Sequence, residues 1–205
     1  MKSLLAVLIL AAVIAGFGTA PRLLAYPTPA MVSHSWNLEF SHDVPRAIAV
    51  KSVDGLTRWY WYMTYKVVNK TGEDRLFVPE ITIATDEGDI VSAGRGVASN
   101  VYDAIKEQAG NRFLESPARV VGKILQGQDY AKESVAIWPV FAHDVTQVTV
   151  FVGGLSGETQ VITIPGTDKS ALVSKTLMMT YKMPGDPASP QNQAVMAQGE
   201  DWIMR

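Results

Sequence analysis

Residues 58–71 read RWYWYMTYKVVNKT, a run of aromatic and β-branched residues. In an extended strand, neighbouring side chains point to opposite faces, so the run divides into two stripes. One stripe is continuously apolar and contains Trp59, Trp61, Met63, Tyr65 and Val67. The other stripe mixes aromatic, cationic and hydroxyl groups and contains Arg58, Tyr60, Tyr62, Thr64, Lys66 and Val68. This pattern predicts one long strand whose apolar stripe faces a hydrophobic core.

The mixed stripe has two interpretations. Tyr60 and Tyr62, with Arg58 and Lys66 beside them, could form an exposed surface for a protein partner or a glycan. Alternatively, a helix or the C-terminal strand covers the two tyrosines. Under the first interpretation, Trp61→Ala should cost roughly 3–5 kcal/mol of stability, and Tyr62→Ala should cost clearly less.

Strand and turn signals continue on both sides of this run, about every ten residues. We expect strands near residues 35–40, 47–53, 57–69, 75–85, 121–125, 133–139, 145–152, 160–164, 176–182 and 201–204. The number and spacing of the strands predict a mainly β, antiparallel two-sheet sandwich.

One segment departs from the strand pattern. Asn100 to Ala109 has Val101 and Ile105 at helical spacing and is followed by Gly110, so it predicts a short helix. Ser116-Pro117 predicts a second helical turn that runs to Val121. The expected domain therefore spans residues 35–165 and has a helical insertion at about 98–120. Residues 166–205 are expected to form a C-terminal strand and a proline-rich tail.

Three short motifs carry a resemblance to a known class of domain. They are Tyr65-Lys-Val-Val-Asn-Lys-Thr-Gly72, Gly122-Lys-Ile-Leu-Gln-Gly127 and Val135-Ala-Ile-Trp-Pro139. In this order they resemble the immunoglobulin-like modules common in exported bacterial proteins, over about residues 60–152. The resemblance implies an immunoglobulin-like sandwich but assigns no functional residues.

The first twenty residues have the order of a secretory signal. Lys2 precedes an uninterrupted apolar stretch from Leu4 to Ala15, and small residues follow. We interpret residues 1–20 as a signal peptide, or as a signal anchor that holds the protein to the membrane through residues 4–20. Residues 21–34 form a spacer rich in proline. The protein is therefore expected to be exported to the periplasm or the extracellular space.

Composition excludes several functional classes. The 18 basic and 20 acidic residues give a formal charge of −2, and no basic block interrupts the chain, so we expect no nucleic-acid partner. The chain has no cysteine, which removes disulfide scaffolds, thiolate metal sites and cysteine nucleophiles.

The remaining candidates for chemistry are scattered. The chain has three histidines, and two of them precede an acid, in His42-Asp43 and His143-Asp144; the third is His34. Asp86-Glu87-Gly88-Asp89 is an acidic turn that could bind calcium, although glycine and solvated acids explain such a turn without an ion. We assign no catalytic, cofactor-binding or metal-binding residue from the sequence.

The favoured function is an exported, noncatalytic module that binds a protein or a surface polymer in the cell envelope. Its contact should involve the 98–120 insertion, because recognition usually resides on connections of a rigid scaffold. Two alternatives stay open. One is an exported hydrolase that uses acids such as Asp86, Asp89 and Asp144 with a histidine, and the other is a membrane-tethered structural protein.

Overall fold

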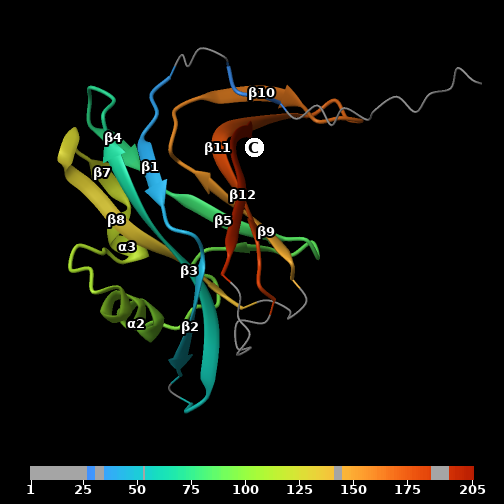
Figure 1. Cartoon of the computed structure of the whole chain (residues 1–205). Coiled ribbons are helices and arrows are strands. Elements are labelled where there is room, and N and C mark those ends of the chain that lie inside the picture. Colours follow the sequence, from blue (N-terminus) through green and yellow to red (C-terminus); the bar gives the residue numbers. More distant parts are fainter. Residues whose placement is uncertain (1–26, 31–34, 53, 141–144, 186–193) are drawn as a thin grey trace, which may run out of the picture.

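The structure is a computed structural model, and it describes residues 27–30, 35–52, 54–140, 145–185 and 194–205. The predicted signal at residues 1–20 lies outside the described residues, as do His34, His143 and Asp144. The described chain is mainly β and forms antiparallel sheets (Figure 1).

The first sheet is built on β3 (Thr57–Asn69), the strand predicted from the aromatic run. On one side β3 pairs with β8 (Gly127–Pro139), and Trp61 lies opposite Trp138. On the other side it pairs with β1 (Glu39–His42) and β2 (Arg46–Lys51), which follow each other along the same edge. The long, apolar β3 therefore has partners on both edges.

β1 and β2 behave as one edge strand that is interrupted at residues 43–45. The Asp43 amide still donates to the Thr64 carbonyl of β3 at 3.0 Å, whereas Pro45 has no amide to donate. Proline and interruptions are common on edge strands, because they limit pairing with a further strand.

The second sheet has the order β10–β11–β9–β5–β6, and β12 also pairs with β11. Its strands are β5 (Glu80–Thr85), β6 (Ile90–Ser92), β9 (Gln147–Gly153), β10 (Thr159–Thr163), β11 (Ser170–Lys182) and β12 (Met196–Met204). The sandwich was expected to end near residue 165, with a C-terminal strand and a proline-rich tail after it. In the structure, residues 170–182 form that strand as β11, which lies between β9 and β12 in the second sheet.

A small ladder and two helices complete the fold. The ladder joins β4 (Arg75–Phe77) to β7 (Gly122–Ile124), so the strand predicted at 75–85 is divided before Pro79. The helices are α2 (Asn100–Ala109) and α3 (Pro117–Val120). α2 ends at Gly110, whose φ of 60° is the left-handed conformation that glycine adopts without strain. Within the described residues, neither helix is long and apolar enough to cross a membrane.

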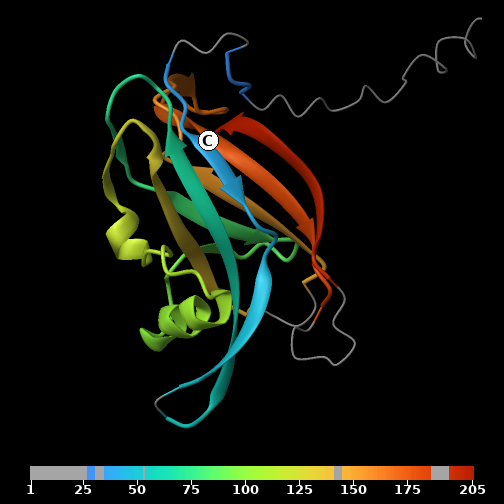
Figure 2. The same cartoon turned by 60° about the vertical axis from the view of Figure 1, so that its left-hand side comes forward.

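The main core lies between the two sheets. Trp61, Met63 and Val67 of β3 are buried there, as the apolar stripe predicted, while Trp59 at the start of the strand is only half-buried. β9 contributes Val148, Val150 and Val152 from the opposite sheet. Figure 2 shows the two sheets facing each other, with α2 on the outer side of the first.

A second apolar cluster lies on the other face of the first sheet. Tyr60 and Tyr62 are only 3% and 5% exposed, because Val101 and Ile105 of α2 are part of the same cluster. The two tyrosines therefore do not form the exposed partner surface of the first interpretation. The alternative, that the helical insertion covers them, is what the structure contains.

The turn after β3 is organised by one buried amide. Asn69 Nδ2 donates to the carbonyls of Glu73 at 2.8 Å and Ile124 at 2.9 Å, and Asn69 Oδ1 accepts from the amide and hydroxyl of Thr71. This side chain links the β3–β4 turn to β7. The Asn69-Lys70-Thr71 motif therefore has a structural explanation in its hydrogen bonds.

Because both faces of β3 are buried, we expect Trp61→Ala and Tyr62→Ala each to cost about 3–5 kcal/mol of unfolding free energy. Tyr130→Ala in β8 is the control, since Tyr130 is 54% exposed and should change stability by about 0.5 kcal/mol or less. Urea unfolding measures all three. A small loss for Tyr62→Ala would contradict the packing of α2 on this face.

Asn69→Ala should cost roughly 2–4 kcal/mol, because the buried Ile124 carbonyl and the Thr71 amide lose their side-chain partner and the turn loses its link to β7. Asn100→Ala removes a single exposed hydrogen bond, from Asn100 Nδ2 to the Lys51 carbonyl, and should cost about 1 kcal/mol or less. Equal losses for the two variants in thermal unfolding would argue against the organising role of Asn69.

Candidate functional site

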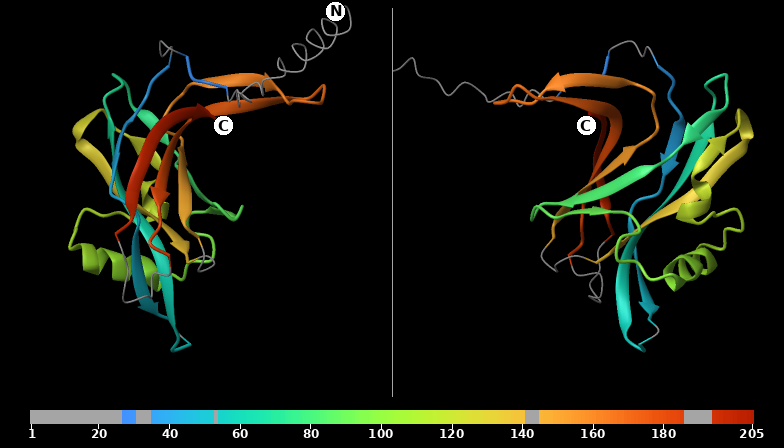
Figure 3. Two further views of the ribbon diagram at one scale, coloured as in Figure 1. Left: turned by 45° about the vertical axis from the view of Figure 1, so that its right-hand side comes forward. Right: turned by 180° about the vertical axis from the view of Figure 1, so that it is seen from behind.

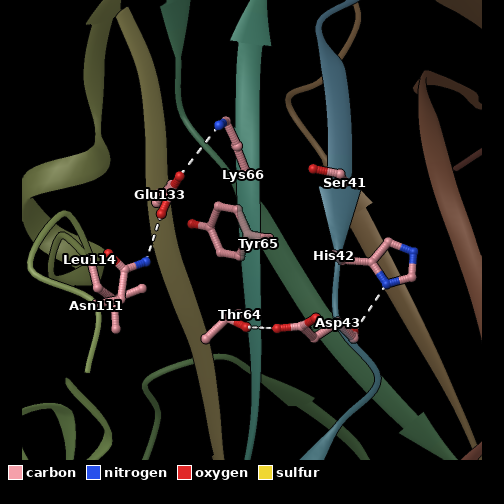
Figure 4. A pocket seen from close by; sticks show the side chains of 9 residues that line it. All are labelled: Ser41, His42, Asp43, Thr64, Tyr65, Lys66, Asn111, Leu114 and Glu133. Carbon is pink, nitrogen blue, oxygen red and sulfur yellow. Dashed lines mark hydrogen bonds and ion pairs between the residues drawn. The ribbon is translucent and has the colours of Figure 1, made fainter. Parts of the chain in front are cut away.

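A polar groove of about 300 Å³ crosses the first sheet beside the loop that leaves α2 (Figure 4). It is formed where β1, β3 and β8 lie side by side and the loop rises along the edge of β8. Its lining residues are Ser41, His42, Asp43, Thr64, Tyr65, Lys66, Asn111, Leu114 and Glu133.

The loop is fixed to β8 by backbone and side-chain bonds. The Glu115 amide donates to the Glu133 carbonyl at 2.8 Å, and Ser134 Oγ donates to the Glu115 carbonyl at 2.9 Å. Leu114 is buried in the second apolar cluster, which anchors the loop from below. The helical insertion therefore supplies a rigid wall of the groove.

Three polar side chains are joined across the groove. Glu133 accepts a hydrogen bond from Asn111 Nδ2 at 2.6 Å through one carboxylate oxygen. The other oxygen lies 3.4 Å from Lys66 Nζ, because Lys66 and Glu133 are opposite each other on β3 and β8. The lysine stays partly exposed, so its remaining N–H groups face solvent in the groove.

The other end of the groove carries a second acid. Thr64 Oγ1 donates to Asp43 Oδ2 at 2.5 Å, where the edge strand is interrupted. Asp43 is exposed, and its other carboxylate oxygen adds an acceptor. The groove thus presents an ammonium group paired with one carboxylate and a second carboxylate at its other end.

Tyr65 lies between Thr64 and Lys66 on β3, but its side chain is buried in the main core on the inner face of the sheet. Burial raises the pKa of its hydroxyl to about 12. The phenol is therefore neutral at physiological pH, and it adds no charge beneath the groove.

The loop that borders the groove also carries an exposed aromatic ring. Phe113 lies between Asn111 and Leu114 in the sequence of this loop and is 64% exposed, with the Arg112 guanidinium 4.6 Å from its ring centroid. A large exposed ring beside polar groups is a common feature of recognition surfaces. The groove combines charge, hydrogen-bonding groups and one accessible apolar contact.

Of the four residues that the sequence analysis proposed as a partner surface, one lines this groove. Lys66 does, whereas Tyr60 and Tyr62 are buried under α2. Arg58 lies near the start of β3 and forms an ion pair with Asp54. Asn111, Glu133 and Phe113 were not predicted from the sequence as site residues. The signal that could have pointed to Asn111 and Phe113 was the helical insertion at about 98–120, which interrupts the strand pattern.

His42 points away from the groove, toward the second sheet. Its Nδ1 atom lies 3.1 Å from the Tyr181 hydroxyl, and its Nε2 atom lies 3.3 Å from Glu200 Oε2 on β12. Burial raises the pKa of Tyr181 well above its ordinary value, so this phenol is also neutral. The contacts connect β1 to β11 and β12 at one side of the sandwich.

The acidic turn at Asp86 has a structural role. Asp86 Oδ2 accepts from the Thr146 hydroxyl at 2.5 Å and from the amides of Thr146 and Gln147, and these bonds lower the pKa of the carboxyl. They tie the β5–β6 turn to the start of β9. Among the residues that the structure describes, no three His, Asp or Glu side chains are grouped as metal ligands.

Comparison with known proteins gives no relative. No protein-family model, no curated protein and no solved structure matches the chain.

The lowered pKa of Asp86 makes a pH-dependent contribution to stability. The contribution is complete above the ordinary carboxyl pKa of 3.8 and is lost as the pH falls through the lowered pKa of the folded state. We expect Asp86→Asn to lower the melting temperature at pH 7, with the difference from wild type shrinking below about pH 4. Asp89→Asn, in the same turn, is the control: its carboxylate takes no part in these bonds, so it should lower the melting temperature at pH 7 less. A difference for Asp86→Asn that stays constant from pH 7 to pH 3 would contradict this role.

Proposed function

We propose that the protein is an exported, noncatalytic binding module of the cell envelope, and that it recognises a protein or a surface polymer through the groove on its first sheet. The observation that carries the proposal is the grouping of Lys66, Asp43 and Glu133 in one groove, which is bordered by the loop that carries the exposed Phe113. The export part rests on the signal-like residues 1–20.

The arrangement of polar groups favours binding. Lys66, Glu133 and Asn111 hold one another in place, so their outward donors and acceptors are pre-positioned for a ligand. Phe113, in the same loop as Asn111, offers an exposed ring for stacking or apolar contact. Such a combination suits hydroxyl and amide groups, which both glycans and peptides carry.

We also propose that the sandwich is immunoglobulin-like, and the strand order supports this. An immunoglobulin-type sandwich pairs strands A, B and E in one sheet and C, F and G in the other. The orders β1–β3–β8 and β5–β9–β11 fit that scheme, with the helical insertion lying between C and E. In this description β12 is an additional strand beyond G.

The test uses a photo-crosslinking amino acid at position 113, with the full chain expressed in its own cells. Cell fractionation first establishes whether the chain is in the envelope, as export requires. We expect a discrete adduct at position 113 and little adduct at Ile90 of β6, which is similarly exposed at 61% but lies on the other sheet. Mass spectrometry and glycan staining then distinguish a protein partner from a polymer.

Charge reversal separates recognition from folding. Lys66→Glu combined with Glu133→Lys preserves an ion pair but exchanges its charges, so it should keep the fold and reduce the adduct at least several-fold. The matched control exchanges Lys123 and Asp74, which are also 3.4 Å apart but lie at β7 and the β3–β4 turn. If the Lys66→Glu/Glu133→Lys variant still gives the full amount of adduct, the groove does not take part in recognition. Hydrolysis of a glycan, peptide or ester that Asp43→Asn or His42→Ala abolishes without unfolding would replace the binding proposal by an enzymatic one.

A further inference from the structure

A β-hairpin arm projects from the second sheet. It consists of β10 and the first part of β11, residues 159–174, and its strands pair from Thr159↔Ser174 to Thr163↔Ser170. Figure 3 shows the arm extending beyond the sandwich, at the end of the molecule away from α2. Among the described residues, β10 pairs with β11 alone.

The arm exposes apolar side chains to solvent. Val161 and Leu172 lie opposite each other and are each 67% exposed, and Ile164 near the turn is also exposed. A two-stranded hairpin is marginally stable in water, and further strands or a packed face stabilise it. The arm therefore has apolar surface and hydrogen-bonding capacity for an additional strand.

The free edge of β10 can be identified from its hydrogen bonds. The Ile164 amide donates to the Lys169 carbonyl at 2.8 Å, and the Lys175 amide donates to the Glu158 carbonyl at 3.0 Å. Because backbone groups alternate in direction along an antiparallel strand, the even-numbered residues from 158 to 164 face β11. The amides and carbonyls of Thr159, Val161 and Thr163 consequently point outward.

This edge lacks the usual protection against pairing. Natural edge strands carry charges, prolines or bulges that prevent association. The β10 sequence TQVIT has no charged residue and no proline, and the partner segment SALVS has none either. The arm's two charges, Asp168 and Lys169, lie in or beside the turn. An uncharged edge is compatible with another uncharged edge.

The edge is also complementary to itself. If two copies of β10 pair in antiparallel orientation about a two-fold axis at Val161, the three outward-facing residues of each strand meet in register. Val161 then faces Val161 of the second copy, and Thr159 faces its Thr163. The exposed Leu172 residues flank the two valines, so one apolar stripe crosses all four strands.

We propose that this hairpin arm is a self-association site, and that two copies of the chain join through β10 in this register to form a continuous four-stranded sheet. The proposal is independent of the groove, which lies on the first sheet and remains accessible in the dimer. Because short strands bury less than the roughly 1,000 Å² typical of stable complexes, the dimer should be weak and concentration-dependent.

The absence of cysteine makes the register directly testable. We expect Val161→Cys to form a disulfide-linked dimer under mild oxidation of the purified full chain, because the two Cα atoms at the axis would be about 5.5 Å apart. Gln160→Cys should cross-link several-fold less, since its counterpart would lie roughly 8 Å away, beyond disulfide reach. Leu76→Cys controls for random collision, because Leu76 is 68% exposed on β4.

A second measurement removes the dependence on cysteine chemistry. Sedimentation analysis of the wild type should show a monomer–dimer equilibrium that Val161→Lys shifts at least tenfold toward monomer without lowering the melting temperature of the sandwich. Leu76→Lys should leave the equilibrium unchanged.

Three results would overturn the proposal. The first is a wild-type chain that stays monomeric at about 100 μM, and the second is equal cross-linking at positions 160 and 161. The third is an arm that binds phospholipid vesicles while the chain stays monomeric, which would assign the exposed residues to a membrane surface.

Discussion

The burial of β3 on both faces is the constraint on which the rest of the structure depends. One stripe of this strand packs Trp61 and Met63 against the second sheet, and the other stripe places Tyr60 and Tyr62 under α2. An antiparallel sheet with one wet face does not need a helix, but a sheet with aromatic residues on both faces does. The helical insertion is therefore part of the folded core. Its return loop, anchored by the buried Leu114, forms the groove because it has to follow the edge of β8.

The groove and the hairpin arm differ in which polar groups they offer to a partner. In the groove, Lys66, Glu133 and Asn111 contact each other, and each retains bonding capacity toward solvent. On the arm, the free groups belong to the backbone of β10, and the side chains next to them are apolar or uncharged. The first pattern favours a ligand with hydroxyl or amide groups, whereas the second favours another strand. The two proposals can therefore fail separately.

Local sequence patterns predicted most of the elements. The bounds of β3 and α2 follow from the alternation at 57–69 and from the helical spacing and Gly110, which are signals contained within each segment. The exposure of Tyr60 and Tyr62 could not be decided in this way, because it depends on where a helix forty residues later packs. The sheet to which residues 170–182 belong could not be decided locally either, since strand pairing with β9 is a long-range property. Asn111 and Glu133 also come together through long-range packing, so no local motif predicts the groove.

The contacts around His42 explain how the sandwich is held at the side where β1 meets the second sheet. β1 is a short edge strand, and its backbone pairs with β3 alone among the described residues. His42 contacts Tyr181 of β11 and Glu200 of β12, so one side chain connects the two sheets across this side. Because Asp43 follows directly and bonds to Thr64, the same short segment fixes one end of the groove. The His42-Asp43 pair, which resembles a fragment of a catalytic site in the sequence, thus divides its two side chains between the inner and outer faces of the sheet. The histidine stabilises the sandwich, and the aspartate contributes to the surface proposed for recognition.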